Sequence, residues 1–361
     1  MKVAIPAEIK NNENRVAITP AGVDTLVQHG HEVFVQRGAG DGSRNSDADY
    51  VAAGATIVPN AEAAWGEAEL LLKVKEPIAS EYGYLREDLT LFTYLHLAAN
   101  KPLIQALLDA KTTAVAYETV QLVDRSLPLL SPMSEVAGRL SILVGAQTLM
   151  SPSGGRGILM GGIPGTPKAK VVVIGGGVAG EHATAEALGM GADVTTIDIS
   201  LPRLRDLERR FNGEIQTRVS NRWEIAEQVS KADLVIGSVL IPGASAPKLV
   251  TLDMVAGMKE GSVLVDIAID QGGCFEGSRP TTHDDPTFAV HNSLYYCVAN
   301  MPGAVPETST RALTNATLPY VTAIADQGWA RAAAEDAALA KGLNTQGGVI
   351  TNDAVAAAFV S

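Results

Sequence analysis

A run of apolar residues followed by closely spaced glycines constrains this chain more than any other feature. The mostly β-branched residues from Val171 to Ile174 predict a buried parallel strand. Gly175, Gly177 and Gly180 follow at once, in the G-x-G-x-x-G spacing. These glycines permit a tight turn, a close backbone approach to a pyrophosphate, and close packing of the next helix on the strand. Because the N-terminal amides of that helix favour phosphate, the segment predicts a dinucleotide site.

A carboxylate at the end of the next strand indicates which dinucleotide binds. That strand ends in Asp198, about 20 residues beyond the glycines, as dinucleotide-binding units require. An acid at this place accepts hydrogen bonds from the adenosine ribose and repels a 2′-phosphate. We therefore expect NAD rather than NADP.

Length and charge exclude several classes of protein. The 361 residues are 46% apolar, which suits roughly two domains with sizeable cores. A formal net charge of −12 and the lack of any Lys or Arg run argue against nucleic acid and against an anionic membrane as partners. Two cysteines, Cys274 and Cys297, are too few for a disulfide framework, and we expect both to be buried, reduced thiols. With neither a signal peptide nor a long apolar run, the chain is predicted to be cytoplasmic.

The order of the elements predicts the fold class α/β, with two doubly wound Rossmann-like domains and a cleft between them. We expect residues 1–130 with 306–361 to form a substrate domain, and residues 131–305 an NAD-binding domain. Ser134 is expected to cap a long buried helix that joins them, and the helices after Pro306 should pack back on the first domain. The expected strands include Val3 to Pro6, Glu32 to Gln36, Ala55 to Ile57, Leu70 to Val74, Leu91 to Leu95, Ile215 to Val219, Leu234 to Val239, Val263 to Ile269 and Tyr295 to Val298.

Several motifs resemble one known family over nearly the whole chain. The chain is similar to the alanine dehydrogenases and to the NAD-binding subunits of proton-translocating transhydrogenases. The motifs are Ile5 to Val23, Lys73 to Pro77, Leu129 to Arg139, Gly161 to Gly165, the Gly175 loop, Gly272 to Glu276, Arg279 to His283 and Asn300 to Gly303.

One segment favours one branch of this family. The stretch Pro132-Met-Ser-Glu-Val-Ala-Gly138 resembles the alanine dehydrogenase form, whereas transhydrogenase subunits carry a different, Gln-rich segment there. The resemblance thus implies reversible NAD-dependent oxidative deamination of L-alanine to pyruvate and ammonia. The alternatives are a soluble NAD-binding transhydrogenase subunit and a lysine-pathway dehydrogenase of the saccharopine type. Family members are often hexamers, so we expect a homo-oligomer.

Two places depart from the family pattern. Glu181-His182 stands where the family more often has Thr-Asn, which should affect only the start of the helix. Some relatives hold magnesium near the C-terminal helices, but we expect Asp326 to have no His or Glu partner nearby. We therefore predict no bound metal.

An amino-acid dehydrogenase needs cations for a carboxylate and a group that titrates near neutrality. Arg15 follows the first strand, and its planar fork suits a carboxylate. Lys75 lies beyond an apolar strand and matches the family's substrate lysine, although Lys73 is a rival on the same face. His96, at the end of another strand, matches the catalytic histidine.

A second catalytic residue is expected in the other domain. Asp270 is predicted to end the strand that begins at Val263, and by resemblance it is the family's second catalytic residue. Asp266 lies inside that strand and should be a buried structural carboxylate. We expect His96 and Asp270 to converge on the substrate.

The remaining contacts of the cofactor are expected at the ends of the other strands and at family positions. They are Ser134, Val178, Ala179, Arg203, Ser220, Val239, Leu240, Ile267, Arg279, Val298 and Met301, together with Asp270.

Overall fold

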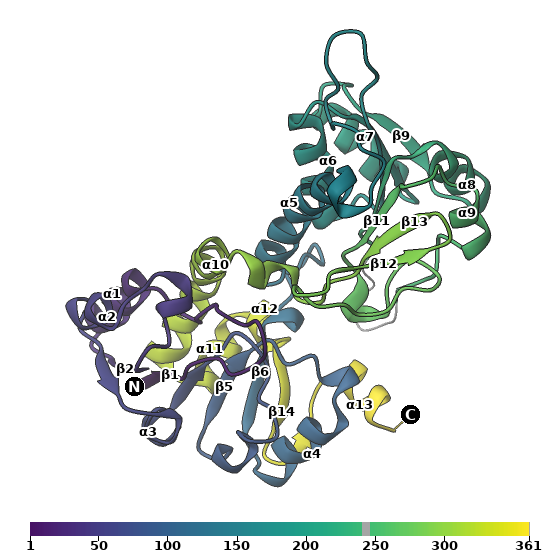
Figure 1. The fold of residues 1–361 in the computed structure, drawn as a ribbon. Helices are drawn as coiled ribbons and strands as arrows, with labels where there is room; N and C mark the ends of the chain where they lie inside the picture. Colours follow the sequence, from purple (N-terminus) through teal and green to yellow (C-terminus); the bar gives the residue numbers. More distant parts are fainter. Residues whose placement is uncertain (240–245, 361) are drawn as a thin grey trace. The chain divides into compact units, whose positions relative to one another are not determined.

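The chain forms two compact units, seen here in a computed structural model that describes residues 1–239 and 246–360 (Figure 1). One unit comprises Met1–Met133 and Gly303–Ser361, and the other Ser134–Pro302. The chain passes from the first to the second within α5 (Ser131–Thr148). Each unit is built on a mainly parallel sheet, so the predicted α/β fold class with two doubly wound domains is confirmed.

The first unit contains, within the described residues, an eight-stranded sheet of order β15-β14-β6-β5-β4-β1-β2-β3. Neighbouring strands from β1 to β6 pair in parallel. Because the order reverses between β1 and β4, ligands are expected outside the carboxyl ends of these strands. The strands are β1 (Lys2–Ile5), β2 (Glu32–Gln36), β3 (Thr56–Val58), β4 (Leu70–Leu72), β5 (Thr90–Thr93), β6 (Thr113–Ala116), β14 (Leu343–Gln346) and β15 (Val349–Ile350).

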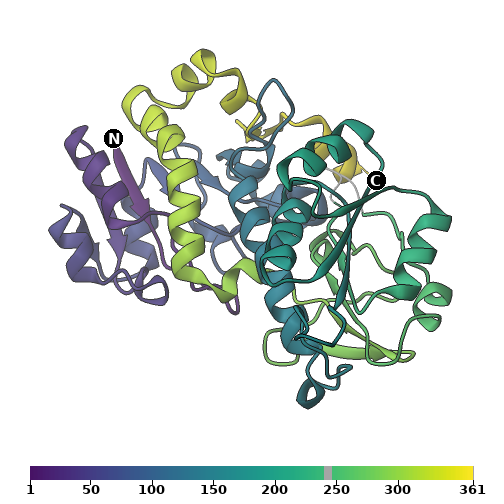
Figure 2. The same ribbon diagram turned by 90° about the horizontal axis from the view of Figure 1, so that it is seen from above.

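Helices cover both faces of this sheet, because alternate residues of each strand point to opposite sides. Val3 and Ile5 pack with α1, α2, α10, α11 and α12, whereas Ala4 and Leu71 pack with α3, α4 and α13. The long helix α10 runs beside α1 in both ribbon views (Figures 1 and 2). The helices are α1 (Pro20–Gln28), α2 (Asp47–Ala52), α3 (Ala61–Glu67), α4 (Lys101–Asp109), α10 (Pro306–Gln327), α11 (Trp329–Glu335), α12 (Ala337–Ala340) and α13 (Asp353–Val360).

A β-hairpin near the C-terminus extends the first sheet. β14 pairs antiparallel with β6 and with β15. Gly347 and Gly348 form the turn between them with φ of +58° and +82°, values that glycine adopts at no steric cost. The sequence indicated only helices after Pro306, so this hairpin was not predicted. Its strands are short and partly polar, which weakens the apolar alternation that marks a strand.

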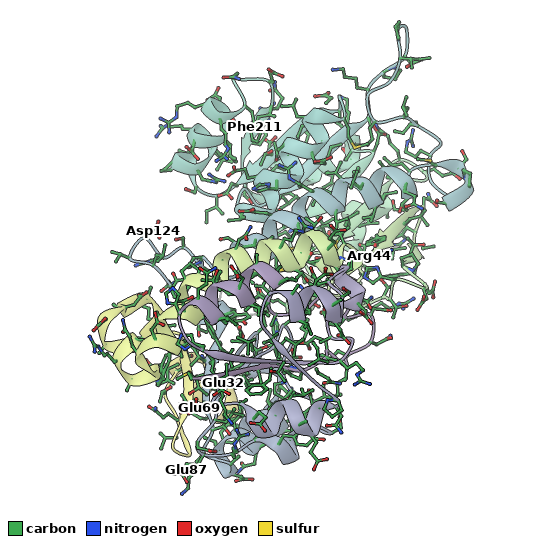
Figure 3. All side chains as sticks on the ribbon, turned by 90° about the vertical axis from the view of Figure 1, so that its left-hand side faces the viewer. Glu32, Arg44, Glu69, Glu87, Asp124 and Phe211 are labelled. Carbon is green, nitrogen blue, oxygen red and sulfur yellow. The ribbon has the colours of Figure 1, made fainter. Side chains whose placement is uncertain are left out.

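The amino edge of the first sheet is an exposed, charged surface. Glu32 and Glu69, labelled in Figure 3, lie at or beside the amino ends of β2 and β4, the two strands that flank β1. The backbone amide of Lys2 donates to Glu69, and the Lys2 ammonium lies 2.8 Å from Glu67. The buried Lys73 and Arg15 side chains described below follow the carboxyl ends of β4 and β1 instead.

The second unit contains, in the part of the chain that is described, a seven-stranded sheet of order β12-β13-β11-β10-β7-β8-β9. All pairs are parallel except β12 with β13, and the order reverses between β7 and β10. α5 and α6 pack on one face, and α8 and α9 on the other. The elements are β7 (Lys170–Ile174), β8 (Asp193–Asp198), β9 (Gln216–Val219), β10 (Leu234–Gly237), β11 (Val263–Asp266), β12 (Thr287–Val290), β13 (Ser293–Tyr296), α6 (Val178–Gly189), α7 (Leu201–Arg210), α8 (Arg222–Lys231) and α9 (Leu252–Ala256).

Local predictions about two of the site residues were wrong. Ser134 does not cap α5, because the helix already begins at Ser131 and Ser134 lies in its first turns. The strand expected to reach Ile269 ends at Asp266, and Asp270 follows in a short 3₁₀ turn, Ile269–Gln271. Among the described residues, none of the helices is long and apolar enough to cross a membrane.

Candidate active site

Two lysines that follow β4 have opposite surroundings. The Lys73 ammonium is 1% exposed and lies 3.1 Å from Glu8 and 2.9 Å from Glu81. Burial lowers the pKa of Lys73, but the two carboxylates outweigh it and raise the pKa above its ordinary value. Lys75 is only half-buried, and its ammonium forms no ion pair with any described residue. The structure thus favours Lys75 over Lys73 as the lysine available to a substrate.

Arg15 is buried rather than solvated. Its Nε donates to Glu13 at 2.7 Å, and a second nitrogen of the guanidinium is paired with the other oxygen of the same carboxylate. Nη1 lies 3.0 Å from the sulfur of Met133. The bidentate contact fixes the plane of the guanidinium and uses two of its five N–H donors.

The ring of His96 lies beside the carboxylate of Glu76, which was not among the predicted site residues. Nδ1 of His96 lies 3.3 Å from Oε2 of Glu76, and the other oxygen of Glu76 is paired with Lys10. Burial raises the pKa of Glu76, but hydrogen bonds and charge from His96 and Lys10 outweigh it and lower the pKa to about 2. Glu76 is therefore ionised at neutral pH. Glu76 belongs to the Lys73 to Pro77 motif, and this motif is the sequence signal that could have identified Glu76 as a site residue.

The backbone of His96 is in the left-handed region, with φ of +48°. This conformation is uncommon outside glycine and needs support from its surroundings. Glu118 supplies that support, because its carboxylate accepts hydrogen bonds from the amides of His96 at 2.7 Å and of Leu95 at 3.1 Å. The bend turns the His96 side chain outward at the end of the strand, with 41% of it exposed.

The glycine loop of the second unit has the geometry of a phosphate site. Gly175 has φ of +100°, and Gly177 precedes the first residue of α6, with open space where a Cβ would stand. A Cβ on Gly180 would lie 1.7 Å from the carbonyl oxygen of Gly175, so only glycine permits this packing of helix on strand. The predicted roles of all three glycines fit this loop.

Asp198 lies beside the same loop, at the end of β8. Its Oδ2 accepts from the Gly176 amide at 2.6 Å, and its Oδ1 accepts from the Ser200 amide at 2.8 Å. Each carboxylate oxygen has a second lone pair, so the group can still accept hydrogen bonds from ribose hydroxyls. Arg203 donates to the Gly176 carbonyl at 2.6 Å and pairs with Asp206 and Glu181, which holds it against the loop.

Several of the other predicted cofactor residues follow strand ends at the carboxyl edge of the second sheet. Leu240 lies outside the described residues. Arg279 is exposed, and its Cζ lies 4.2 Å from the centroid of the Phe288 ring. Ser134 lies in α5. Those that follow strand ends are Ser220 after β9, Val239 after β10, Ile267 after β11, and Val298 and Met301 after β13, while Val178 and Ala179 begin α6.

Asp266 and Asp270 differ in burial, and Asp266 is the buried structural carboxylate that the sequence predicted. Asp266 is fully buried and accepts hydrogen bonds from the Cys274 amide at 2.9 Å and from the Ser278 hydroxyl at 2.7 Å. It therefore anchors the loop that carries Asp270, whose side chain is exposed.

Cys274 and Cys297 are free and buried, and burial raises the pKa of each thiol to about 12, so both are unreactive at neutral pH.

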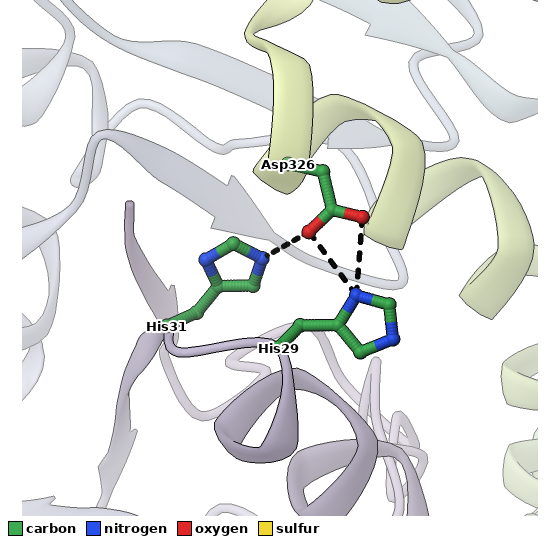
Figure 4. A group of neighbouring side chains, drawn as sticks. All are labelled: His29, His31 and Asp326. Carbon is green, nitrogen blue, oxygen red and sulfur yellow. Dashed lines mark hydrogen bonds and ion pairs between the residues drawn. The ribbon is translucent and has the colours of Figure 1, made fainter.

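Asp326 has two histidine partners, contrary to the sequence-based expectation. His31 Nε2 lies 2.8 Å from Oδ1 of Asp326, and His29 Nδ1 lies 3.1 Å from Oδ2 (Figure 4). The expectation was wrong because the partners are far apart in the sequence and meet only where α10 packs beside α1.

Family models match both parts of the chain. The alanine dehydrogenase/PNT N-terminal domain matches residues 4–137, and the alanine dehydrogenase/PNT C-terminal domain matches residues 141–353. The chain belongs to the alanine dehydrogenase/PNT family. Members of this family work with a nicotinamide dinucleotide, which agrees with the geometry of the Gly175 loop.

Individual members of the family are similar over almost their whole length. Alanine dehydrogenase of Mycolicibacterium smegmatis is 64% identical over 356 residues, which are 99% of this chain and 96% of the relative. Alanine dehydrogenase of Mycobacterium tuberculosis is 62% identical with the same coverage, and that of Halomonas elongata is 55% identical over 99% of this chain and 97% of the relative.

Solved structures separate the two branches of the family. An L-alanine dehydrogenase structure matches with a TM-score of 0.96 and 50% identity, covering 100% of this chain and 99% of that one. A transhydrogenase from Sinorhizobium meliloti matches with a TM-score of 0.82 and 28% identity, covering 98% of this chain and 100% of that one. The chain is thus closer to the alanine dehydrogenase branch in both sequence and structure.

Proposed function

We propose that the chain catalyses the reversible oxidative deamination of L-alanine to pyruvate and ammonia. The observation that carries this proposal is the placement of Arg15, Lys75 and His96 after β1, β4 and β5, around the switch point of a doubly wound sheet. Higher similarity to alanine dehydrogenases than to a transhydrogenase supports the choice of substrate. We assign residues 1–130 with 306–361 to the substrate domain and residues 131–305 to the cofactor domain.

The proposed cofactor is NAD, held at the Gly175 loop with its adenosine ribose at Asp198. The carboxylate retains acceptor sites after binding the Gly176 and Ser200 amides, and its charge opposes a 2′-phosphate. Arg203 is engaged by Glu181, Asp206 and the Gly176 carbonyl. When bound, NAD⁺ accepts a hydride from Cα of alanine.

The residues of the first unit would bind the substrate and move its proton. Arg15 and Lys75 hold the carboxylate of alanine and the carbonyl of pyruvate, two tasks that suit cations. His96 takes a proton from the substrate nitrogen as the hydride leaves. Glu76, ionised beside Nδ1 of His96, holds the proton on that nitrogen and leaves Nε2 to act as the base.

Water then adds to the imino acid, and ammonia leaves. Asp270, from the second unit, is proposed to orient this water and to stabilise the developing positive charge. Overall, L-alanine, NAD⁺ and water give pyruvate, ammonium, NADH and a proton.

The test is the formation of NADH by the purified chain with a panel of amino acids. L-Alanine should be the best substrate, and pyruvate with ammonium should oxidise NADH. Activity with saccharopine or lysine would instead favour the lysine-pathway alternative. Binding of NADH without any amino-acid turnover, together with transhydrogenation in the presence of a membrane partner, would favour the transhydrogenase subunit.

We also propose a homo-oligomer in the cytoplasm. Exposed apolar side chains support association: Leu143 on α5 is 48% exposed, and Leu159 and Ile163 in the following loop are 63% and 62% exposed. Light scattering at micromolar concentration should give a mass above that of one chain, and a hexamer would match the family. A monomer would contradict the proposal.

A further inference from the structure

The His29, His31 and Asp326 side chains have the composition and spacing of a transition-metal site. One ligand atom from each lies within 4.8 Å of the others. Tetrahedral zinc, bound at about 2.0 to 2.2 Å, requires ligand atoms about 3.3 Å apart. His31 Nε2 and His29 Nδ1 lie 2.8 and 3.2 Å from the same oxygen, Oδ1 of Asp326, and both distances are already close to that value. A cation could therefore enter with small side-chain shifts (Figure 4).

The backbone holds all three ligands in place. His29 caps the C-terminus of α1, and its amide donates to the Thr25 carbonyl. Gly30, with φ of +84°, turns the chain so that His31 enters β2 from the same side. Asp326 lies in the last turn of α10, which packs beside α1.

The histidine rings are oriented toward the carboxylate. The His31 ring is 7% exposed, and its Nδ1 lies 3.4 Å from the amino group of Met1, so Nε2 faces Asp326. His29 and Asp326 are 44% and 35% exposed, which leaves the open side of the cluster to water. Such a site would hold three protein ligands and one water molecule.

The ligand types select the kind of cation. Two imidazoles and one carboxylate suit Zn²⁺, Co²⁺ or Ni²⁺, whereas Mg²⁺ prefers oxygen ligands and keeps its waters. We propose that His29, His31 and Asp326 bind one divalent transition-metal ion that joins the turn between α1 and β2 to the end of α10. The site is at the amino edge of the sheet, on the opposite edge from Lys75 and His96, so its role would be structural.

Calorimetric titration of the full chain, first stripped with a chelator, with ZnCl₂ would test this proposal. One Zn²⁺ ion should bind per chain, and Co²⁺ should give the intense visible absorption of tetrahedral coordination. Since even outer-sphere partners of a metal cost about 10- to 100-fold in affinity, His29→Gln and Asp326→Asn should each weaken Zn²⁺ binding at least about tenfold.

Two controls make the result specific. His291→Asn removes another exposed histidine, and Asn tolerates its φ of +51°, so this variant should bind Zn²⁺ as the wild type does. MgCl₂ should not compete with Zn²⁺. Absence of saturable Zn²⁺ binding, or equal affinity in wild type and His29→Gln, would show an ion-pair cluster only and overturn the proposal. His29 is exposed, so its variant should fold, which circular dichroism would verify.

Discussion

Oε2 of Glu76 lies 3.3 Å from Nδ1 of His96, and this contact joins the predicted catalytic base to an ionised carboxylate. Glu76→Gln keeps the size and shape of the side chain, but it removes the negative charge and replaces one acceptor oxygen with an NH₂ donor. Turnover should fall about tenfold or more, because the imidazole loses its fixed tautomer and orientation. Affinity for NADH, measured by fluorescence titration, should not change. Unchanged turnover would mean that Glu76 has no role in positioning His96.

Glu76 should also contribute to stability in a pH-dependent way. Its pKa is lowered from 4.5 to about 2, so the folded state gains stability from its ionised form above pH 4.5 and loses that gain as pH falls toward 2. In urea titrations, the difference in free energy of unfolding between wild type and Glu76→Gln should therefore shrink across this range. A difference that is constant from pH 6 to pH 2 would contradict the assignment.

His96 and Asp270 should both be required for turnover. Replacing His96 with Ala or Asp270 with Asn is expected to lower turnover by roughly 10² to 10⁴ and to leave NADH binding within a few fold. Stopped-flow measurements of hydride transfer would separate chemistry from binding, and His291→Asn is the matched histidine control. If His96→Ala kept near wild-type turnover, Lys75 would become the better candidate for the proton carrier.

Lys73 and Lys75 should respond differently to the same substitution. Lys75→Met should fold normally and raise the apparent Michaelis constant for pyruvate about 10- to 100-fold, the loss expected for a charged hydrogen bond. Lys73→Met leaves Glu8 and Glu81 buried without their cation, so unfolding free energy should drop by about 3 to 5 kcal/mol. Steady-state kinetics and thermal unfolding would distinguish them. If the two substitutions had equal effects on the Michaelis constant and on stability, the assignment of Lys75 to substrate binding and of Lys73 to stability would be contradicted.

Asp198 should determine the choice of coenzyme. Asp198→Ser removes a charge and a ribose acceptor, so the ratio of catalytic efficiency with NAD to that with NADP should fall by at least about tenfold. Asp193→Asn, at the exposed opposite end of β8, should leave the ratio unchanged. A wild-type preference for NADP would refute the role given to Asp198.

Periodicity and glycine spacing predicted the parts of the fold that depend on local sequence. The Gly175 turn and the strand ending in Asp198 are both present. The hairpin at Gly347 was missed because its strands are short and polar. Strand ends were also placed too late, as at Asp266, because apolar character continues into the following turn.

The surroundings of the site residues could not be predicted, because they come from distant segments. Glu118 holds the His96 backbone, and Glu76 meets its ring, although neither lies in the same element as His96. The pairing of Asp326 with His31 joins the two ends of the chain. Contacts of this kind depend on how helices pack on the sheet, and no local pattern encodes them.

The hairpin of β14 and β15 has a consequence for synthesis on the ribosome. The unit of residues 134–302 is continuous, so it can fold as soon as it leaves the exit tunnel. The amino-terminal segment of the other unit, Met1–Met133, emerges first, yet it must wait for α10 and for the strand that covers β6. Until then β6 has an open edge, which is a site for pairing with other chains. The nascent protein should depend on chaperones most strongly during the translation of residues 134–342.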